Sequence, residues 1–388
     1  MLKSVRTAGA VLRKRLSARA AGSCERALEE GSRQSARSRS SLPLSPSSHL
    51  RRSPCRPMSY LLAIVFALIH GVTELFPVSS LGHSVIVPAW IGGSWQTLVT
   101  QSSQGSSEQS FYLAFIVALH VATALALLVF FRADWIRIVR GLIRSVRRSI
   151  PERKITIEGS DERLAWLIII ATIPVGLTGL ALEHTFRTIF AKPLAASIFL
   201  FVNGFILLAG ERLRRRAVST GLGMEQSARS AMPTAGGAPE LASRGGRSAQ
   251  DVAEAFASDE RISRMPYRDA IYVGLLQVLA LFAGISRSGV TMVGGLWRGL
   301  DHEDSARFAF LLATPVILAA GILKVPTLFG HAGDHIHGQV AVGFVITGVT
   351  AYVSIRFLVR YFETRTLTPF AGYCLLAGLA SIVRFSVG

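Results

Sequence analysis

Hydrophobic residues in this chain gather in long runs separated by short polar or basic stretches. Six runs are close to the roughly 20 residues that a helix needs to cross a bilayer: 111–131, 164–183, 194–210, 305–323, 338–359 and 367–385. Two further apolar stretches, 59–92 and 268–299, are interrupted by Pro, Gly and Ser. Each of these predicts a re-entrant helix pair instead of two clean spans. The pattern predicts an all-α integral membrane protein.

An internal repeat relates the two interrupted stretches. At an offset of 207 residues, Val78-Ser79-Ser80-Leu81-Gly82 falls on Ile285-Ser286-Arg287-Ser288-Gly289 without a gap. Each copy is followed by three spanning candidates, so each crosses the membrane an odd number of times. We therefore predict an inverted-topology repeat, each half a re-entrant helix pair plus three transmembrane helices. Such folds place sites where the repeats meet, near mid-membrane, and non-helical backbone there must be buried or line a wet cavity.

Four regions are predicted along the chain. Residues 1–57 form a basic, disordered N-terminal extension, 59–210 the first membrane repeat, 211–265 a flexible cytoplasmic loop and 266–388 the second repeat. The loop is rich in Gly, Ala, Ser and Arg, which is typical of flexible segments. The extension is Arg- and Ser-rich like a transit peptide, but we favour a disordered tail or translated upstream sequence with the true start at Met58.

Composition excludes several classes of protein. The chain has 388 residues, 50% of them hydrophobic, a net charge of +18 and a mean hydropathy of +0.42. This is incompatible with a wholly disordered chain. The basic clusters flank apolar runs without interleaved aromatic residues, so no nucleic-acid partner is expected. The three cysteines, Cys24, Cys55 and Cys374, form no CxxC motif and no disulfide framework.

Basic residues also predict the orientation. The 132–154 loop and the segment after the 194–210 span are rich in Arg, so we place both in the cytoplasm. Residues 1–57 would then lie outside, although they carry thirteen Lys and Arg against three Glu. This violates the positive-inside rule, so either the extension is absent from the mature protein or 59–92 spans the membrane; we favour the first.

The first interrupted stretch holds three ionisable residues within fourteen positions: His70, Glu74 and His83. Ionisable groups at membrane depth are costly and are functional candidates by default. His70 and Glu74 share a helix face, and Ser79 and Ser80 follow in a turn. A hydroxyl near an imidazole suits a nucleophile or an acid–base pair, and a glutamate suits a hard cation. The alternative is a structural hydrogen-bonded knot that closes the loop.

The second interrupted stretch places Arg287 between Ser286 and Ser288, with Gly289 and Thr291 following. A guanidinium offers phosphate oxygens a planar fork of donors, and a helix N-terminus adds N–H groups. The alternative is an arginine that snorkels to the membrane surface. On the 111–131 run, His120 and Thr123 either line the same cavity or make interhelical hydrogen bonds.

At these two stretches the sequence resembles the undecaprenyl-diphosphate phosphatase family, the bacterial bacitracin-resistance proteins. The family motif E-G-x-T-E-F-L-P-[VI]-S-S-T-G-H resembles the segment His70 to His83, and P-G-x-S-R-S-G-x-T resembles Ala283 to Thr291. The family's L-H-x-x-T resembles Leu119 to Thr123, and its F-x-F-L-L-x-x-P resembles Phe308 to Pro315. The resemblance covers about 59–210 and 266–388.

The resemblance implies hydrolysis of a polyprenyl diphosphate to the monophosphate, which recycles the lipid carrier for peptidoglycan synthesis and confers bacitracin resistance. It also implies a bacterial plasma (inner) membrane protein with its pocket opening to the outer, periplasmic face. A homodimer is left open. The implied catalytic residues are Glu74, Ser80, His83 and Arg287; the implied phosphate-binding residues are Ser79, Ser286, Arg287, Ser288 and Thr291. Glu74, with His70 as a doubtful second ligand, would bind Mg²⁺ or Ca²⁺, and the nucleophile is either Ser80 or His83.

Three positions depart from the family pattern. His70 stands where the family usually has Glu or Gln, Leu81 replaces the usual Thr, and Ala283 replaces the usual Pro. An imidazole fits hard cations poorly, so metal use is the property most affected. The alternative function is a polyprenyl-phosphate flippase or transporter with the same phosphate pocket. A soluble-type acid phosphatase motif set is rejected, because Val293 occupies the position that this set gives to His.

Overall fold

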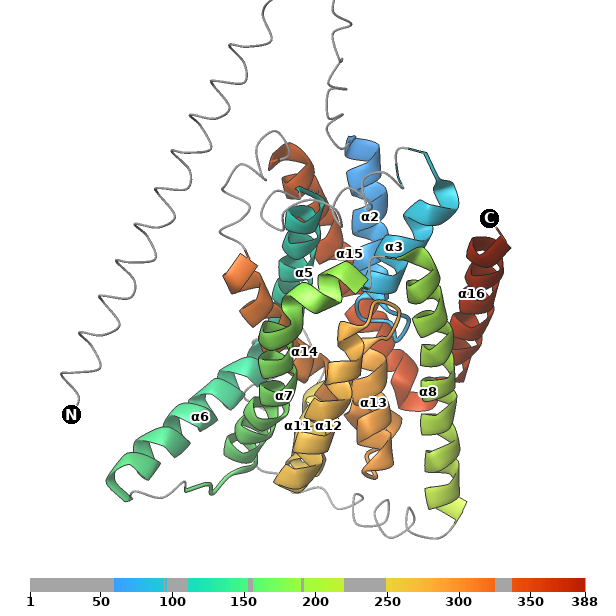
Figure 1. Ribbon diagram of the computed structural model, residues 1–388. Helices are drawn as coiled ribbons and strands as arrows, with labels where there is room; N and C mark the ends of the chain where they lie inside the picture. Colours follow the sequence, from blue (N-terminus) through green and yellow to red (C-terminus); the bar gives the residue numbers. More distant parts are fainter. Residues whose placement is uncertain are drawn as a thin grey trace, which may run out of the picture. The chain divides into compact units, whose positions relative to one another are not determined.

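The described part of the computed structural model is entirely helical (Figure 1). It comprises residues 59–93, 95, 111–152, 156–189, 192–219, 249–324 and 337–387. The predicted extension at 1–57 lies outside it. The α-helices are α2 (Tyr60–Thr73), α3 (Ser80–Ile91), α5 (Phe111–Phe130), α6 (Arg132–Glu152), α7 (Ser160–Ile189), α8 (Pro193–Ser219), α11 (Ala249–Ser263), α12 (Tyr267–Val278), α13 (Arg287–Trp297), α14 (His302–Lys324), α15 (His337–Thr364) and α16 (Thr368–Val387).

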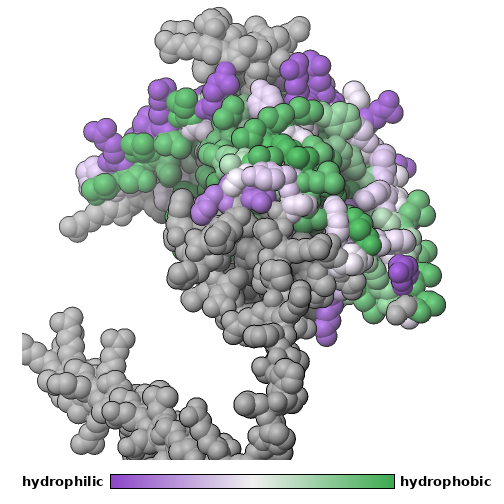
Figure 2. All heavy atoms as spheres, turned by 90° about the horizontal axis from the view of Figure 1, so that it is seen from above, coloured by the Kyte–Doolittle hydropathy of each residue, from purple (hydrophilic) through white to green (hydrophobic). Residues whose placement is uncertain are grey.

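Five of the six predicted membrane spans are confirmed at the level of helix length and hydropathy; the run 111–131 passes only when it is joined to α6. Among the described residues, five helices are long and apolar enough to cross a bilayer, and a sixth is obtained if α5 and α6 count as one broken span. Large apolar side chains such as Leu376 (73% exposed) and Ile322 (72%) point outward, as lipid contact requires. In Figure 2, hydrophobic residues cover much of the coloured surface. The chain is a multi-pass membrane protein.

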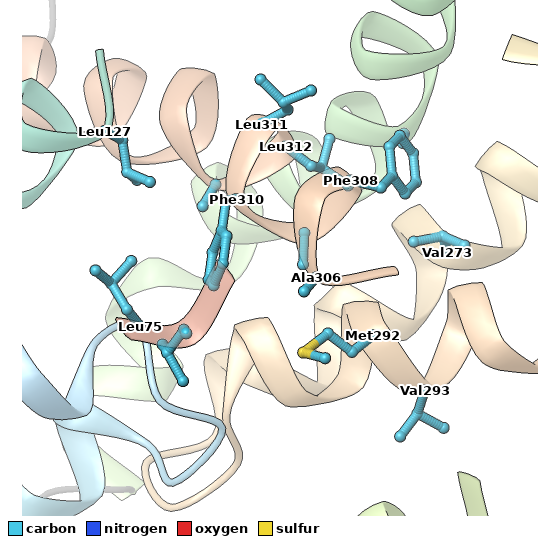
Figure 3. Packing of buried hydrophobic residues seen from close by; sticks show 14 of the residues in the cluster. Leu75, Leu127, Val273, Met292, Val293, Ala306, Phe308, Phe310, Leu311 and Leu312 are labelled. Carbon is cyan, nitrogen blue, oxygen red and sulfur yellow. The ribbon is translucent and has the colours of Figure 1, made fainter. Parts of the chain in front are cut away.

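Helix α14 is the most enclosed of the five spans. In its most apolar window 61% of the residues are buried, against 22% for α16. Its side chains Phe308, Phe310 and Leu312 are fully buried in the main hydrophobic cluster. Figure 3 shows them in the same cluster as Leu75. Because Leu75 directly follows Glu74, this packing anchors the first loop to the core.

The two interrupted stretches each form a short helix pair, as predicted. Helices α2 and α3 are too short to count as spans, and α12 and α13 are separated by a 3-10 turn, Leu279–Leu281, and a short loop. In Figure 1 the loops of the two pairs lie side by side, with α2 above them and α13 below. The inverted repeat as a whole remains a prediction.

The basic segment 132–154, predicted as a loop, is mostly helix α6. It bends by 85° from α5. Its exposed apolar residues Ile136, Val139 and Ile143 recur every three or four positions, the spacing of one helix face, while arginines occupy other positions. A basic amphipathic helix of this kind is suited to lie in the membrane interface.

The prediction of a flexible loop at 211–265 is wrong where the structure describes it. Helix α8 continues to Ser219, and α11 fills 249–263; residues 220–248 lie outside the described part. Helix α11 is held by charges, because Asp259 accepts hydrogen bonds from Arg307 at 2.7 and 3.0 Å. Arg261 donates to Asp304 at 2.6 Å, and this bond raises the pKa of its guanidinium. The segment before α11 is rich in Gly, Ala and Ser, and this composition led to the prediction of a loop through the helix as well.

Close packing of α16 on α8 gives a test of the fold. A Cβ added at Gly378 would meet the backbone nitrogen of Phe201 at 2.6 Å, whereas one at Gly372, on the same helix, meets nothing within 4 Å. We expect Gly378→Ala to destabilise the protein by about 1–3 kcal/mol through overpacking. Gly372→Ala should be neutral or stabilising by up to about 1 kcal/mol. Thermal unfolding in detergent measures both, and equal Tm values would contradict the packing.

Candidate functional site

The first loop is a strained turn that begins helix α3. Pro77 follows the end of α2, and Ser79 has φ of 69°, the one positive φ outside glycine among the described residues. The Ser79 hydroxyl caps α3 by accepting from the Gly82 N–H at 3.2 Å. Strained backbone of this kind clusters at functional sites. The turn places Ser80 as the first residue of α3.

The second loop repeats this local geometry. The Ser286 hydroxyl caps α13 by accepting from the Gly289 N–H at 3.2 Å, and Arg287 is the first residue of that helix. The offset of 207 residues found in the sequence relates Ser79 to Ser286 and Ser80 to Arg287. The helix N-termini of α3 and α13 thus present equivalent positions, each with the positive end of a helix dipole.

The two loops are in direct contact. The Gly284 N–H donates to the Ser79 hydroxyl at 3.2 Å. A Cβ added at Gly82 would lie 2.9 Å from the Cα of Gly284, so only glycine permits this approach. Gly284 itself has φ of 116°, which also favours glycine.

Asn203 of α8 joins the loops from the side. Its amide nitrogen donates to the Pro77 carbonyl at 3.0 Å, and its amide oxygen accepts from the Ser286 N–H at 3.0 Å. Asn203 is fully buried. One side chain therefore satisfies a backbone group from each loop. Sequence reasoning attached no role to Asn203; a lone amide inside the apolar run 194–210 was the available signal.

Glu74 is the point where the predicted site residues converge. Its carboxylate accepts hydrogen bonds from the Ser80 hydroxyl and from the Arg287 guanidinium. The side chain is only 6% exposed. His120 Nε2 lies 3.4 Å from Oε2 of this carboxylate, and His70 Nε2 lies 3.9 Å from the same oxygen. The predicted grouping of Glu74, Ser80 and Arg287 across the two loops is present in the structure.

A cavity of about 310 Å³ opens beside these residues. Glu74, Ser80 and Arg287 contribute polar groups to its wall, with Ser79, His120, Gln277 and Ser286. Much of the remaining wall is apolar and comes from α5, α7, α14 and the second loop, including Ile116, Val175, Leu281 and Ile317. The cavity thus combines a charged end at two helix N-termini, suited to an anion, with walls suited to a hydrocarbon chain.

His83 lies away from this arrangement. Its Nδ1 is 2.7 Å from the Ser79 carbonyl, and its Nε2 is 2.7 Å from the Tyr373 hydroxyl. Because a carbonyl only accepts, Nδ1 carries the proton and Nε2 accepts from Tyr373. Both ring nitrogens are engaged, and His83 is not among the cavity-lining residues. The sequence suggested a hydroxyl–imidazole pair in this stretch, but the structure pairs His83 with the Ser79 carbonyl and with Tyr373 of α16. The contact with α16 was not predicted.

Two predicted phosphate-binding residues also lie off the cavity wall. The Thr291 hydroxyl donates to the Arg287 carbonyl at 2.8 Å within α13. The Ser288 hydroxyl lies 3.0 Å from that of Ser286 and 3.4 Å from the Phe76 carbonyl. Ser79, Ser286 and Arg287 do line the cavity. A phosphate role for Ser288 and Thr291 stays a prediction.

The donor set beside Glu74 does not fit Mg²⁺ or Ca²⁺. His70, Glu74 and His120 offer one ligand atom each, all within 4.8 Å of one another. Two of the three donors are imidazole nitrogens, whereas hard cations take oxygen ligands. Both oxygens of the one carboxylate already accept hydrogen bonds from Ser80 and Arg287. A magnesium or calcium site at these residues is therefore not supported.

The fold and the site define a multi-pass helical membrane protein with a partly charged cavity at the contact of two interrupted helix pairs. The chain matches the family model described as bacitracin resistance protein BacA over residues 63–380, and it belongs to this family.

Named relatives agree with the match. The chain is 58% identical over 345 residues to undecaprenyl-diphosphatase 2 of Frankia alni, covering 85% of this chain and 99% of that protein. It is 52% identical over 326 residues to the undecaprenyl-diphosphatase of Mycolicibacterium paratuberculosis, covering 84% and 97%. It is 39% identical over 336 residues to the undecaprenyl-diphosphatase of Acidiphilium cryptum, covering 85% and 100%.

The bridge made by Asn203 yields a prediction. In Asn203→Leu the Pro77 carbonyl and the Ser286 N–H lose their partner, and each buried group left unpaired costs about 1–3 kcal/mol. We expect a lowered Tm in detergent. The matched control is Ser197→Ala on the same helix, since the buried Ser197 hydroxyl donates to the Pro193 carbonyl of its own helix, 2.7 Å away, and to no other described residue. If Asn203→Leu has the same Tm as this control, the two hydrogen bonds of Asn203 do not contribute to stability.

Proposed function

We propose that this protein hydrolyses undecaprenyl diphosphate to undecaprenyl phosphate and inorganic phosphate. The observation that carries the proposal is the hydrogen bond from the Ser80 hydroxyl to the buried Glu74 carboxylate, beside the Arg287 guanidinium. A hydroxyl bonded to a base is the arrangement of an activated nucleophile. The family membership and the names of the relatives support the same substrate and reaction.

The diphosphate would bind at the charged end of the cavity. Arg287 supplies a permanent positive charge and up to two parallel N–H donors to phosphate oxygens. The N-termini of α3 and α13 add dipoles of the same sign. The lipid chain would follow the apolar wall formed by residues such as Ile116, Val175 and Ile317. In this pose the terminal phosphorus faces Ser80.

The reaction then proceeds in two displacements. Ser80 Oγ attacks the terminal phosphorus while its proton passes to the Glu74 carboxylate. The anhydride P–O bond breaks, and undecaprenyl phosphate leaves with the electron pair. Water next attacks the phosphoserine and its proton stays on the departing inorganic phosphate, while Glu74 returns the first proton to the Ser80 oxygen. Arg287 stabilises the charge on the transferring phosphoryl group in both steps.

The alternative flippase is not favoured by this site. A flippase would use Arg287 and the helix N-termini to hold a phosphate, but it has no need of a hydroxyl bonded to a buried carboxylate.

His83 fits a supporting role in the proposed phosphatase, since its two ring nitrogens connect the start of α3 to Tyr373 of α16.

The proposal also covers the location of the protein and its orientation in the membrane. We place the protein in the bacterial plasma membrane with α6 and the Arg-rich end of α8 in the cytoplasm, according to the positive-inside rule. The α2–α3 pair then enters from the outer side, and the cavity serves substrate from that side. The product would return to the lipid cycle that supports peptidoglycan synthesis.

Phosphate release tests the proposal. The full chain in detergent, supplied with a polyprenyl diphosphate, should release phosphate, and Arg287→Ala should reduce the rate by at least about 100-fold, because removing one preorganised donor alone costs this much. Arg264→Ala is the control, since the Arg264 side chain is 63% exposed and, within the part of the chain that the structure describes, its ion pair is with Glu260 of α11. Release by Arg287→Ala at the control's rate, or no release by a folded parent protein, would contradict the proposed function.

A further inference from the structure

A second cavity, of about 200 Å³, lies beside the start of α6. Its wall is formed by the bend between α5 and α6, by α11, by the start of α14 and by the later part of α15. It shares no lining residue with the cavity beside Glu74. Arginine and glutamate side chains lie together in this wall, next to aromatic rings. A cavity with charges of both signs is suited to a charged ligand.

Two arginines of this wall lack an acidic partner. Arg307 is paired, because its guanidinium donates to Asp259 at 2.7 and 3.0 Å. Arg356 and Arg360 are exposed and, within the described part of the chain, form no ion pair and no side-chain hydrogen bond. They lie one helical turn apart on α15 and therefore share one face of this helix. Two neighbouring guanidiniums suit the oxygens of a phosphate group.

The glutamates of the same wall are unpaired as well. Glu254 of α11, Glu303 of α14 and Glu363 of α15 form no ion pair with any residue that the structure describes. Glu303 is partly buried, and a carboxylate withdrawn from water without a partner is costly. An anion held by the arginines alone would leave these carboxylates unpaired and would be repelled by them. A ligand with both a phosphate and an ammonium group satisfies the arginines and the glutamates.

The length of α15 places this cavity at the edge of the bilayer. The helix has 28 residues, which corresponds to about 42 Å, against a hydrocarbon core of about 30 Å. Val345, Val349 and Val353 are 62, 60 and 61% exposed, and their spacing of four positions is that of a lipid-facing stripe on one side of a helix. Arg356 and Arg360 follow this stripe directly. A lipid headgroup can therefore enter the cavity while its acyl chains lie along α15.

We propose that this cavity binds the headgroup of a phospholipid that carries a primary amine, as in phosphatidylethanolamine. Arg356 and Arg360 hold the phosphate, and Glu254 and Glu303 hold the ammonium group. A primary ammonium has three N–H donors for carboxylates, whereas the quaternary ammonium of choline has none and suits aromatic cages. The site is separate from the cavity that contains Ser80 and goes beyond the proposed function.

The competing account is a patch of basic surface that attracts any anionic lipid. It explains the arginines but gives no role to the glutamates beside them. The two accounts differ in which headgroup the purified protein prefers, and this is measurable without a polyprenyl diphosphate.

The experiment uses the full chain in detergent after removal of bound lipid. Phosphatidylethanolamine, phosphatidylcholine and phosphatidylglycerol with the same acyl chains are added in turn, and native mass spectrometry measures the lipid bound per chain. We expect one phosphatidylethanolamine per chain, bound at least about tenfold more tightly than the other two lipids. The double variant Arg356→Gln, Arg360→Gln should weaken this binding by at least about tenfold, the size expected from losing a hydrogen bond to a charged group. Arg365→Gln is the control, because Arg365 is exposed just after α15 and lies outside the cavity wall.

A change of headgroup preference makes the test specific. The double variant Glu254→Gln, Glu303→Gln keeps the arginines and removes two negative charges, so it should lose its preference for phosphatidylethanolamine and bind phosphatidylglycerol more tightly than the parent does. A misfolded protein would not exchange one preference for another. Glu260→Gln is the control, because Glu260 also lies on α11 but outside the cavity wall, with its side chain 46% exposed.

Three results would overturn the proposal. The first is equal binding of the three lipids by the parent, or tighter binding of phosphatidylglycerol, which would identify a basic patch instead. The second is unchanged binding of phosphatidylethanolamine by the arginine double variant. The third is displacement of the lipid by an equal concentration of glycerophosphoethanolamine, which would show that a soluble headgroup is sufficient. Because no polyprenyl diphosphate is present, none of these results depends on phosphate release.

Discussion

The site depends on one buried carboxylate that accepts hydrogen bonds from both interrupted helix pairs. Glu74 is 6% exposed, and a charge removed from water in this way is stable only when it is paired and hydrogen-bonded. Ser80 supplies one bond from the start of α3 and Arg287 a second from the start of α13. Burying this charge is costly, and the two hydrogen bonds that stabilise it also fix the positions of Ser80 and Arg287.

The surrounding backbone allows the two loops to come close enough for Ser80 and Arg287 to reach the same carboxylate. Ser79 and Ser286 cap equivalent helices, and the Ser79 hydroxyl also accepts from Gly284 of the other loop. Gly82 and Gly284 allow the loops to touch, and Asn203 satisfies one backbone group from each. Leu75 ties the first loop to the core formed by α14. Each contact is local, yet together they hold Ser80 and Arg287 on one carboxylate.

Interrupted apolar runs and ionisable residues at membrane depth are visible in the sequence, and they were enough to predict the helical membrane fold and to single out Glu74 and Arg287. The grouping of these residues with Ser80 and His83 was what the family resemblance implied, and His83 does not line the cavity. The links made by Asn203 and Tyr373 were not predictable, since a single polar residue in an apolar run does not specify its partner. Helix α11 was missed because charged pairs, such as that of Asp259 with Arg307, hold it to the bundle. His120 was a candidate, but its approach to His70 and Glu74 depends on how α5 packs.

The central claim is that Glu74 activates Ser80, and it is tested by replacing each partner conservatively and measuring phosphate release from a polyprenyl diphosphate. Ser80→Ala and Glu74→Gln should both fall to background while the protein stays folded. His83→Gln, which keeps a donor and an acceptor for the Ser79 carbonyl and Tyr373, should retain measurable turnover. Turnover by Ser80→Ala together with its loss in His83→Gln would contradict the account and make His83 the nucleophile.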